Sequence, residues 1–231
     1  MRIALAQIQS QSGQIDQNIA HHLHWIDQAI AARSDAIFFP ELSLTNYEPE
    51  LADTLQMQLR DERLSIFQEK SDAAKITIGF GMPLRTADGV QIAMLIFQPD
   101  QPLRYYAKQI LHEDELPYFI SGKEQAYIDI NGIKVASAIC YESLQESHLQ
   151  NAIENGAQLY LASVAKAQKG INKANIHFPK MAKQYQIPIL MVNSLGKSDN
   201  FIAAGQSGVW NEKGEKVRQL SAKQENLLLY E

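Results

Sequence analysis

The sequence contains a single cysteine, Cys140, among its 231 residues. One cysteine cannot form an internal disulfide, which excludes the small secreted folds that depend on disulfides and favours a reducing compartment. The N-terminus also lacks the pattern of a secretory leader, because Gln7 and Gln9 interrupt its apolar residues. These absences lead us to expect a cytoplasmic protein.

Long apolar runs and an excess of positive charge are missing as well. The longest uninterrupted apolar run, Ile92–Phe97, is far too short to span a membrane. The 21 lysines and arginines are outnumbered by 26 aspartates and glutamates, so the net charge of −5 gives no general attraction to nucleic acid or anionic lipid. We therefore expect neither a nucleic-acid nor a membrane partner. With 45% apolar and 20% charged residues, the chain can bury a sizeable core.

Short apolar segments alternate along the chain with segments of helical periodicity. Ile15, Ile19, Leu23 and Ile26 recur at the spacing of one helix face. Further helices are predicted over Leu51–Phe67, Leu144–Ile153 and Asn172–Tyr185. The apolar runs predict strands at Arg2–Ile8, Ala36–Phe39, Lys75–Phe80, Gln91–Gln98, Tyr127–Ile130, Ile133–Ile139, Gln158–Val164, Pro188–Asn193 and in short segments after Ser207.

This order of elements predicts an α/β fold with mixed sheets. Helices between strands indicate parallel crossovers, whereas Asp88-Gly89 and Asn131-Gly132 are typical of hairpin turns. No linker, charge block or low-complexity stretch divides the chain, so residues 1–231 are predicted to form one domain. So many strands suit two sheets packed together, with helices outside.

Three polar residues stand next to apolar segments where chemistry could occur. Cys140 ends the strand predicted at Ile133–Ile139, and Glu41 follows Ala36–Phe39 after one proline. Lys108 lies between two apolar patches in LRYYAKQIL. Taken singly, each has a plain alternative: a small core cysteine, a surface glutamate and a solvated lysine. Together they make a chemically sufficient set, because a carboxylate can take the thiol proton and an ammonium can stabilise the resulting negative charge.

The segments around these residues resemble the three catalytic blocks of the nitrilase superfamily of carbon–nitrogen hydrolases. The blocks are FFPELSLTNY (Phe38–Tyr47), YYAKQIL (Tyr105–Leu111) and ASAICYES (Ala136–Ser143). Their order and their spacings, 67 residues from 41 to 108 and 32 from 108 to 140, fit that family. Weaker similarity extends through RIALAQIQ, NGAQLYLASVA, MVNSLG and GQSGVW, and so covers nearly the whole chain. The resemblance implies a four-layer αββα sandwich.

The resemblance also implies roles for individual residues. Glu41 would be the general base, Lys108 the stabiliser of the transition state and Cys140 the nucleophile. The backbone N–H of Tyr141 would contribute to the oxyanion hole. Family members often have a second glutamate soon after the lysine, for which Glu115 is the better match.

Two positions make the match to the family less direct. Glu113 is close enough to Glu115 to be the alternative second glutamate. The family's glycine before the tyrosine of the first block is Asn46 here, which also tolerates left-handed backbone conformations. The tyrosine itself, Tyr47, is expected to contact the substrate.

By this resemblance the protein would hydrolyse a non-peptide carbon–nitrogen bond of a small amide or carbamoyl compound through a cysteine thioester. A nitrile hydrolase, or a member that transfers the acyl group to another acceptor, would use the same three residues. A protein that kept the fold for binding and lost turnover is the alternative from another class. The mechanism needs no cofactor or metal, and the resemblance implies a homodimer or larger homo-oligomer.

Lys166 is a further candidate, on positional grounds. It follows the strand at Gln158–Val164 as Glu41 follows Ala36–Phe39, so both would face one pocket. A lysine there could hold a substrate carboxylate, whereas the plain alternative is a solvated loop lysine.

The other polar signals are weak. His21 and His24 lie one helical turn apart without the further ligands of a metal site. Cys140 has no papain-like signature that would pair it with His148 or His177. Gly79-Phe80-Gly81 starts like a dinucleotide fingerprint but is interpreted as a turn.

Overall fold

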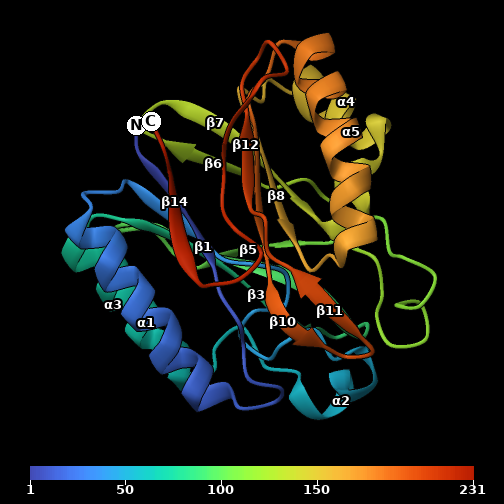
Figure 1. Ribbon diagram of the computed structural model, residues 1–231. Coiled ribbons are helices and arrows are strands. Elements are labelled where there is room, and N and C mark those ends of the chain that lie inside the picture. The colour runs from blue at the N-terminus through green and yellow to red at the C-terminus, as the bar shows by residue number, and fades with distance from the viewer.

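The chain is built around two six-stranded β-sheets, and the computed structural model describes all 231 residues (Figure 1). The strands of the first sheet are β1 (Ile3–Gln7), β2 (Ala36–Phe38), β3 (Thr77–Arg85), β4 (Val90–Phe97), β5 (Arg104–Ala107) and β14 (Asn226–Tyr230). Their order is β14-β1-β2-β3-β4-β5. The central strands β1, β2 and β3 are parallel, whereas β14, β4 and β5 pair antiparallel with their neighbours.

The second sheet repeats this plan. Its strands are β6 (Tyr127–Ile130), β7 (Ile133–Ile139), β8 (Leu159–Val164), β9 (Ile189–Asn193), β12 (Gly208–Trp210) and β13 (Lys216–Gln219), in the order β13-β12-β9-β8-β7-β6. Here β7, β8 and β9 are the parallel strands. A separate two-stranded sheet consists of β10 (Leu195–Ser198) and β11 (Phe201–Ala204).

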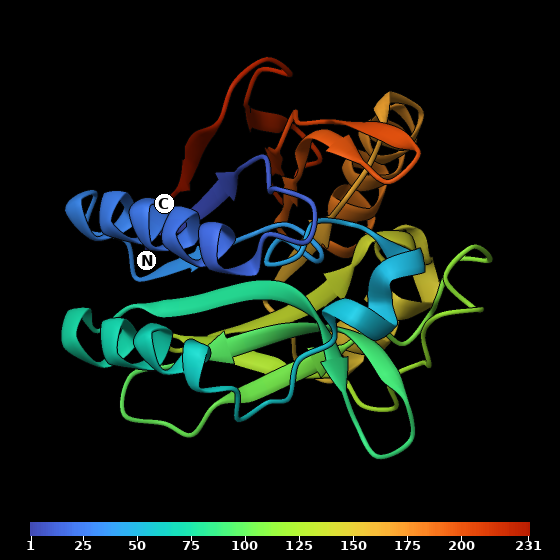
Figure 2. The same cartoon turned by 90° about the horizontal axis from the view of Figure 1, so that it is seen from below.

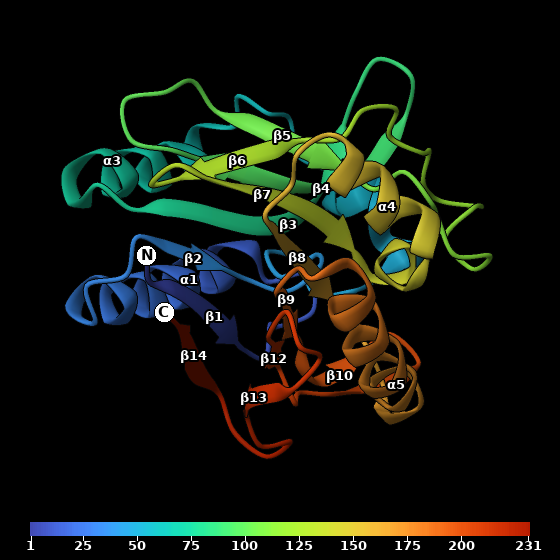
Figure 3. The same ribbon diagram turned by 90° about the horizontal axis from the view of Figure 1, so that it is seen from above.

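Helices cover the outer face of each sheet. The longer ones are α1 (Ile15–Ala31), α3 (Ser65–Ala74), α4 (Glu146–Glu154) and α5 (Gln168–Tyr185). Ile26 of α1 and Phe67 of α3 pack on the first sheet, while Leu149 of α4 and Phe178 of α5 pack on the second. Figures 2 and 3 show α1 and α3 side by side, away from α4 and α5. The predicted four-layer αββα sandwich is confirmed.

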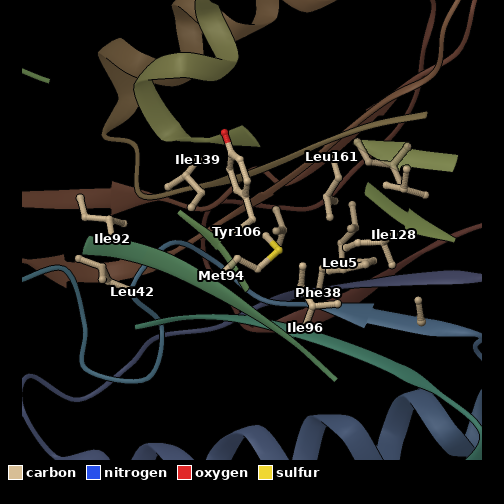
Figure 4. Close-up of a cluster of buried hydrophobic side chains, with 14 of the residues drawn as sticks. Leu5, Phe38, Leu42, Ile92, Met94, Ile96, Tyr106, Ile128, Ile139 and Leu161 are labelled. Atoms are coloured by element: carbon tan, nitrogen blue, oxygen red, sulfur yellow. The ribbon is translucent and has the colours of Figure 1, made fainter. Parts of the chain in front are cut away.

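A third apolar cluster fills the space between the two sheets. Leu5, Phe38 and Met94 of the first sheet meet Ile128 and Leu161 of the second (Figure 4). Because helices cover the opposite faces, the central strands are buried on both sides. This explains why they read as continuous apolar runs rather than as alternating patterns.

The predicted hairpin between β6 and β7 is confirmed. Asn131 and Gly132 both have positive φ, 52° and 82°, as the tightest right-twisted hairpin turn requires. The two ends of the chain meet in the first sheet, where β14 pairs with β1 (Figure 1). None of the helices combines the length and apolar character that a membrane crossing requires.

The single helix predicted over Leu51–Phe67 is wrong. The segment instead forms two 3₁₀ turns and a short helix before α3: η1 (Pro49–Leu51), α2 (Ala52–Leu55) and η2 (Glu62–Leu64). Met57 interrupts the helix because its backbone N–H donates to Pro83 at 3.0 Å and its carbonyl accepts from Arg85 at 2.9 Å. Pairing with the end of β3 thus overrides the apolar spacing.

The turn interpreted at Gly79-Phe80-Gly81 is also wrong, since these residues lie inside β3. The glycines are there for close packing. A Cβ on Gly81 would lie 2.2 Å from the backbone nitrogen of Leu42, so only glycine lets the loop after β2 approach this strand. That loop carries Glu41.

Three strands were not predicted: β5, β10 and β11. Each has only four residues, and exposed side chains occur in all three. Such short edge segments carry little periodicity, so their pairing depends on neighbours that the local sequence does not reveal. Helix α5 likewise begins at Gln168, four residues before the predicted start at Asn172.

Candidate active site

Three of the residues expected to carry chemistry follow the carboxyl ends of parallel strands, and Lys108 follows the antiparallel edge strand β5. Glu41 comes after β2, Cys140 after β7 and Lys166 after β8. The carboxyl ends of parallel strands share one edge of a sheet, where functional groups gather. The hydroxyl of Ser163, in β8, donates to the carbonyl of Phe39 at 2.8 Å and so links the ends of strands from the two sheets.

The centre of the site is a buried lysine between two buried glutamates. The Nζ of Lys108 donates to Oε1 of Glu41 at 2.8 Å and to Oε1 of Glu115 at 2.6 Å. The side chains of all three are at most 1% exposed. Buried charges are tolerated only when they are paired and hydrogen-bonded, so this cluster exists because each member compensates another.

Glu41 is the less satisfied of the two carboxylates. Its Oε2 is buried without a hydrogen-bond partner. Burial raises the pKa of Glu41 to about 7, because the desolvation of the carboxylate outweighs the attraction of Lys108. Burial alone would lower the pKa of Lys108, but Glu41 and Glu115 together hold it well above its usual value. The cluster therefore combines a permanent cation with a carboxylate that titrates near neutrality.

Glu115 is the better satisfied carboxylate. Its Oε1 also accepts the hydroxyl of Tyr47 at 3.0 Å, and its Oε2 accepts the backbone N–H of His112 at 2.8 Å. Glu113, the alternative in the sequence, is exposed. Of the two candidates only Glu115 contacts Lys108, and Tyr47 joins the same hydrogen-bonded group.

Cys140 lies at a sharp bend between β7 and the 3₁₀ turn η3 (Cys140–Leu144). Its φ of 48° is in the left-handed region, which a residue with a side chain adopts only where its surroundings impose it. The helix expected after the cysteine does follow, although α4 begins only at Glu146. A bend of this kind exposes the side chain at the sheet edge, as in the strand–turn–helix elbows that carry nucleophiles.

The thiol of Cys140 lies in an environment that disfavours the thiolate. Burial and the charge of Glu41 raise its pKa to about 11, although Lys166 and Lys108 act in the opposite direction. At neutral pH the sulfur is therefore protonated. It requires a base to become a nucleophile.

A buried carboxylate that sequence reasoning missed, Glu142, fixes the Cys140 bend to the loop after Lys108. Its two oxygens accept four hydrogen bonds, from the backbone N–H groups of Ile139, Gln109 and Ile110 and from the hydroxyl of Tyr106, at 2.6–3.1 Å. The signal in the sequence was the acid two positions after the cysteine, in CYE. Glu142 therefore holds Cys140 and Lys108 in fixed positions relative to each other.

His148 and His21 have structural contacts outside the cavity lining. Both ring nitrogens of His148 are engaged, by the hydroxyls of Tyr106 at 2.9 Å and Tyr160 at 2.8 Å, so His148 is not available as a base for Cys140. On helix α1, His21 lies 3.1 Å from a carboxylate oxygen of Glu225.

His22, also on α1, supports the loop that carries Glu41. Burial lowers its pKa to about 3, so the ring is neutral. Nδ1 then donates to the carbonyl of Asn18 at 2.7 Å, and Nε2 accepts the hydroxyl of Ser43 at 2.9 Å. The amide of Asn18 in turn donates to the carbonyl of Leu44 at 2.9 Å.

Lys166 is buried beside the thiol, with 6% of the residue exposed. Its Nζ lies 3.1 Å from the carbonyl oxygen and 3.5 Å from the Sγ of Cys140. Lys166 is therefore not a solvated loop lysine.

A cavity of about 480 Å³ opens above these groups. Its lining includes Cys140, Glu115, Tyr47, Tyr141 and Lys166, together with His112, Asp114, Leu144, Gln145, Ala165, Ala167, Gly170, Lys173 and Phe201. Such a volume suits a small molecule. The sulfur and the second lysine thus face the same space, while Glu41 and Lys108 lie beneath its lining.

Comparison with known proteins gives relatives of two kinds, NAD(+) synthetases and an omega-amidase. Glutamine-dependent NAD(+) synthetase of Acinetobacter baylyi is 26% identical over 98% of this chain and 43% of its own length. The chain thus spans less than half of that relative. The omega-amidase YafV of Yersinia enterocolitica is 24% identical over 62% of this chain and 55% of its own length.

Solved structures share the fold. The amidase of Nesterenkonia sp. AN1, from the nitrilase superfamily, has a TM-score of 0.88 at 20% identity, covering 99% of this chain and 89% of its own. NAD+ synthetase of Acinetobacter baumannii has a TM-score of 0.86 at 25% identity, covering 99% of this chain and 44% of its own. The family model for carbon-nitrogen hydrolases matches residues 2–231. With this match over essentially its whole length, the chain belongs to the carbon-nitrogen hydrolase family.

Proposed function

We propose that this protein hydrolyses small carboxamides through a thioester on Cys140. The observation that carries the proposal is that the sulfur lines the same cavity as Glu115, which Lys108 joins to the buried Glu41. A thiol with a raised pKa beside a carboxylate that titrates near neutrality is a nucleophile paired with its base.

The first half-reaction forms the thioester. Glu41 takes the proton of the thiol while Sγ bonds to the carbonyl carbon, and the carbonyl oxygen acquires the negative charge. Lys108 uses two of its three N–H bonds on carboxylates, so the third is free for this oxygen, beside the backbone N–H of Tyr141. When the C–N bond breaks, the proton on Glu41 passes to the departing ammonia or amine.

The second half-reaction releases the acid. Glu41 takes a proton from water as the water oxygen bonds to the thioester carbon, and collapse of this intermediate breaks the C–S bond. The proton returns to the sulfur. A base that gains and loses a proton in each half-reaction works best with a pKa near the working pH, which burial of Glu41 supplies.

The relatives support carboxamides as the substrate class. A structure of the Nesterenkonia amidase holds butyramide, YafV is named an omega-amidase and the synthetases are named for their dependence on glutamine, itself a carboxamide. The alternatives are nitrile hydrolysis, acyl transfer and binding without turnover. Each would give a different result in an assay of ammonia release from small amides.

The first prediction concerns the nucleophile. Purified protein is expected to release ammonia from some member of a panel of small amides, and Cys140→Ala to abolish this release without lowering the melting temperature. The cysteine side chain is small and contributes little to packing, so removing its sulfur is expected to affect only the chemistry. Turnover of nitriles only, acyl transfer to hydroxylamine without hydrolysis, or activity in Cys140→Ala would each contradict the proposal.

The second prediction separates two buried glutamates. Glu41→Gln is expected to lower kcat by at least about 100-fold, the usual contribution of a general base, while changing the unfolding free energy by less than about 1 kcal/mol. The small change is expected because ionised Glu41 does not stabilise the fold: burial raises the pKa of its carboxyl group, and one of its oxygens has no hydrogen-bond partner.

The matched control is Glu142→Gln. Replacing a carboxylate that accepts four hydrogen bonds with an amide is expected to destabilise the fold by about 3 kcal/mol, measured by denaturant unfolding. Equal stability losses in Glu41→Gln and Glu142→Gln would argue that both glutamates are structural.

The third prediction is a pH profile. The active form of Glu41 is the carboxylate, so kcat/KM should be constant well above pH 7 and fall as pH drops through about 7, the pKa to which burial raises it. Below that pH the fall should approach about tenfold per pH unit, as one proton blocks the base. A profile that breaks near pH 4.5 instead would show an unperturbed carboxylate.

The fourth prediction concerns assembly. We propose that residues 1–231 act as one unit, since a core cluster is shared by both sheets, and that this unit forms a cytoplasmic homodimer. Ile176 of α5 and Ile202 of β11 are 76% and 64% exposed, which leaves apolar surface for contact. Light scattering at micromolar concentration should then give twice 26.0 kDa, and the monomer mass alone would refute the dimer.

A further inference from the structure

A second lysine approaches the sulfur of Cys140 from the second sheet, whereas Lys108 follows β5 of the first sheet. Lys166 leads from β8 into α5, and its Nζ lies 3.5 Å from Sγ of Cys140 and 3.1 Å from the carbonyl oxygen of the same residue. Its aliphatic stem is packed. A Cβ on Gly170 would lie 3.1 Å from the Cβ of Lys166, so the glycine leaves the space in which this stem lies.

The backbone of Lys166 is held on both sides. Its N–H donates to Oδ1 of Asn193 at 2.8 Å, and its carbonyl accepts Nδ2 of Asn193 at 3.0 Å and the N–H of Ala204 at 2.9 Å. Asn193 is fully buried. A side chain anchored in this way keeps its ammonium near the sulfur at a lower entropic cost than a loop lysine would.

The charge of Lys166 is not paired with a carboxylate. No Asp or Glu oxygen lies within 4 Å of its Nζ, whereas the charge of Lys108 is shared between Glu41 and Glu115. With Glu41 ionised, these two carboxylates and two ammonium groups sum to zero. Without Lys166 the site would carry a net charge of −1, and transfer of the thiol proton to Glu41 would move a negative charge onto the sulfur, which Lys166 faces at 3.5 Å.

We propose that Lys166 is a further catalytic residue, whose ammonium stabilises the negative charge that appears on the sulfur of Cys140. The inference rests on the proposed function. As Glu41 removes the thiol proton, negative charge builds on Sγ until the S–C bond is complete, and it builds again when the C–S bond breaks during thioester hydrolysis. Lys166 faces the sulfur at both moments, while Lys108 serves the carbonyl oxygen.

This role differs from the one that the sequence suggests for Lys166. A lysine that holds a carboxylate at the far end of a substrate belongs away from the reacting carbon, but Lys166 lies against the nucleophile itself. The electrostatic effect on the thiol agrees with a role at sulfur, because Lys166 lowers the pKa of Cys140 against the effects of burial and Glu41.

Alkylation by iodoacetamide tests the proposal without relying on amide turnover. The reagent is neutral and carries no carboxylate; the thiolate attacks its methylene carbon, the S–C bond forms and iodide leaves. Lys166→Met, which keeps the length of the stem and removes the charge, is expected to lower the second-order rate constant at about pH 8 by at least about tenfold. The rise of the rate with pH should move to higher pH.

The controls separate charge from structure. Lys169→Met removes an exposed lysine three residues further on and should alkylate at the wild-type rate. Lys166→Arg keeps a positive charge and should retain more of the rate than Lys166→Met. Melting temperatures identify any variant with a damaged fold, and Lys166→Gln then serves as a second neutral variant.

The result that overturns the proposal is a wild-type alkylation rate and pH profile in folded Lys166→Met. In that case, a raised KM confined to amides that bear a carboxylate would return Lys166 to the role of a substrate clamp. Failure of the amidase proposal is a separate result, because wild-type protein that turns over no amide would still show whether alkylation of Cys140 depends on Lys166.

Discussion

The ammonium of Lys108 allows two carboxylates to lie buried side by side, and the rest of the site depends on that arrangement. Glu41 and Glu115 are both within 2.8 Å of its Nζ and almost inaccessible to water. Without the lysine, two adjacent negative charges in this interior would repel each other and one would take up a proton. With it, Glu115 can be fully hydrogen-bonded while Glu41 keeps one unpartnered oxygen and a pKa near neutrality.

Rigid surroundings keep these charges where they are. Glu142 connects the Cys140 bend to the segment after Lys108, while close packing at Gly81 and the neutral ring of His22 fix the loop of Glu41. Each of these contacts stabilises the fold and also keeps a residue of the site in position. The site is thus assembled from loops of both sheets, and the apolar cluster between the sheets brings those loops together.

In our proposals each charged residue of the site has its own role. Glu115 is restrained by several donors and Glu41 acts as the base, while Lys108 serves the oxygen of the substrate and Lys166 serves the sulfur. This division explains why the thiol can stay protonated at rest, with a pKa near 11, and still be used as a nucleophile. A protonated resting thiol is also less exposed to oxidation and alkylation than a free thiolate.

The layers and the catalytic candidates can be predicted from the sequence, because fully covered strands must read as apolar runs and because Glu41, Lys108 and Cys140 stand in three blocks of distinctive order and spacing. The sequence did not determine the segment around Met57, where pairing with β3 overrode helical spacing, or the four-residue strands. Nor could it distinguish Glu115 from Glu113, or reveal that Lys166 lies against the sulfur and that Glu142 connects the Cys140 bend to the loop after Lys108. Those outcomes follow from the folded arrangement, because burial and pairing arise between side chains that are far apart in the chain and meet only when the two sheets pack together.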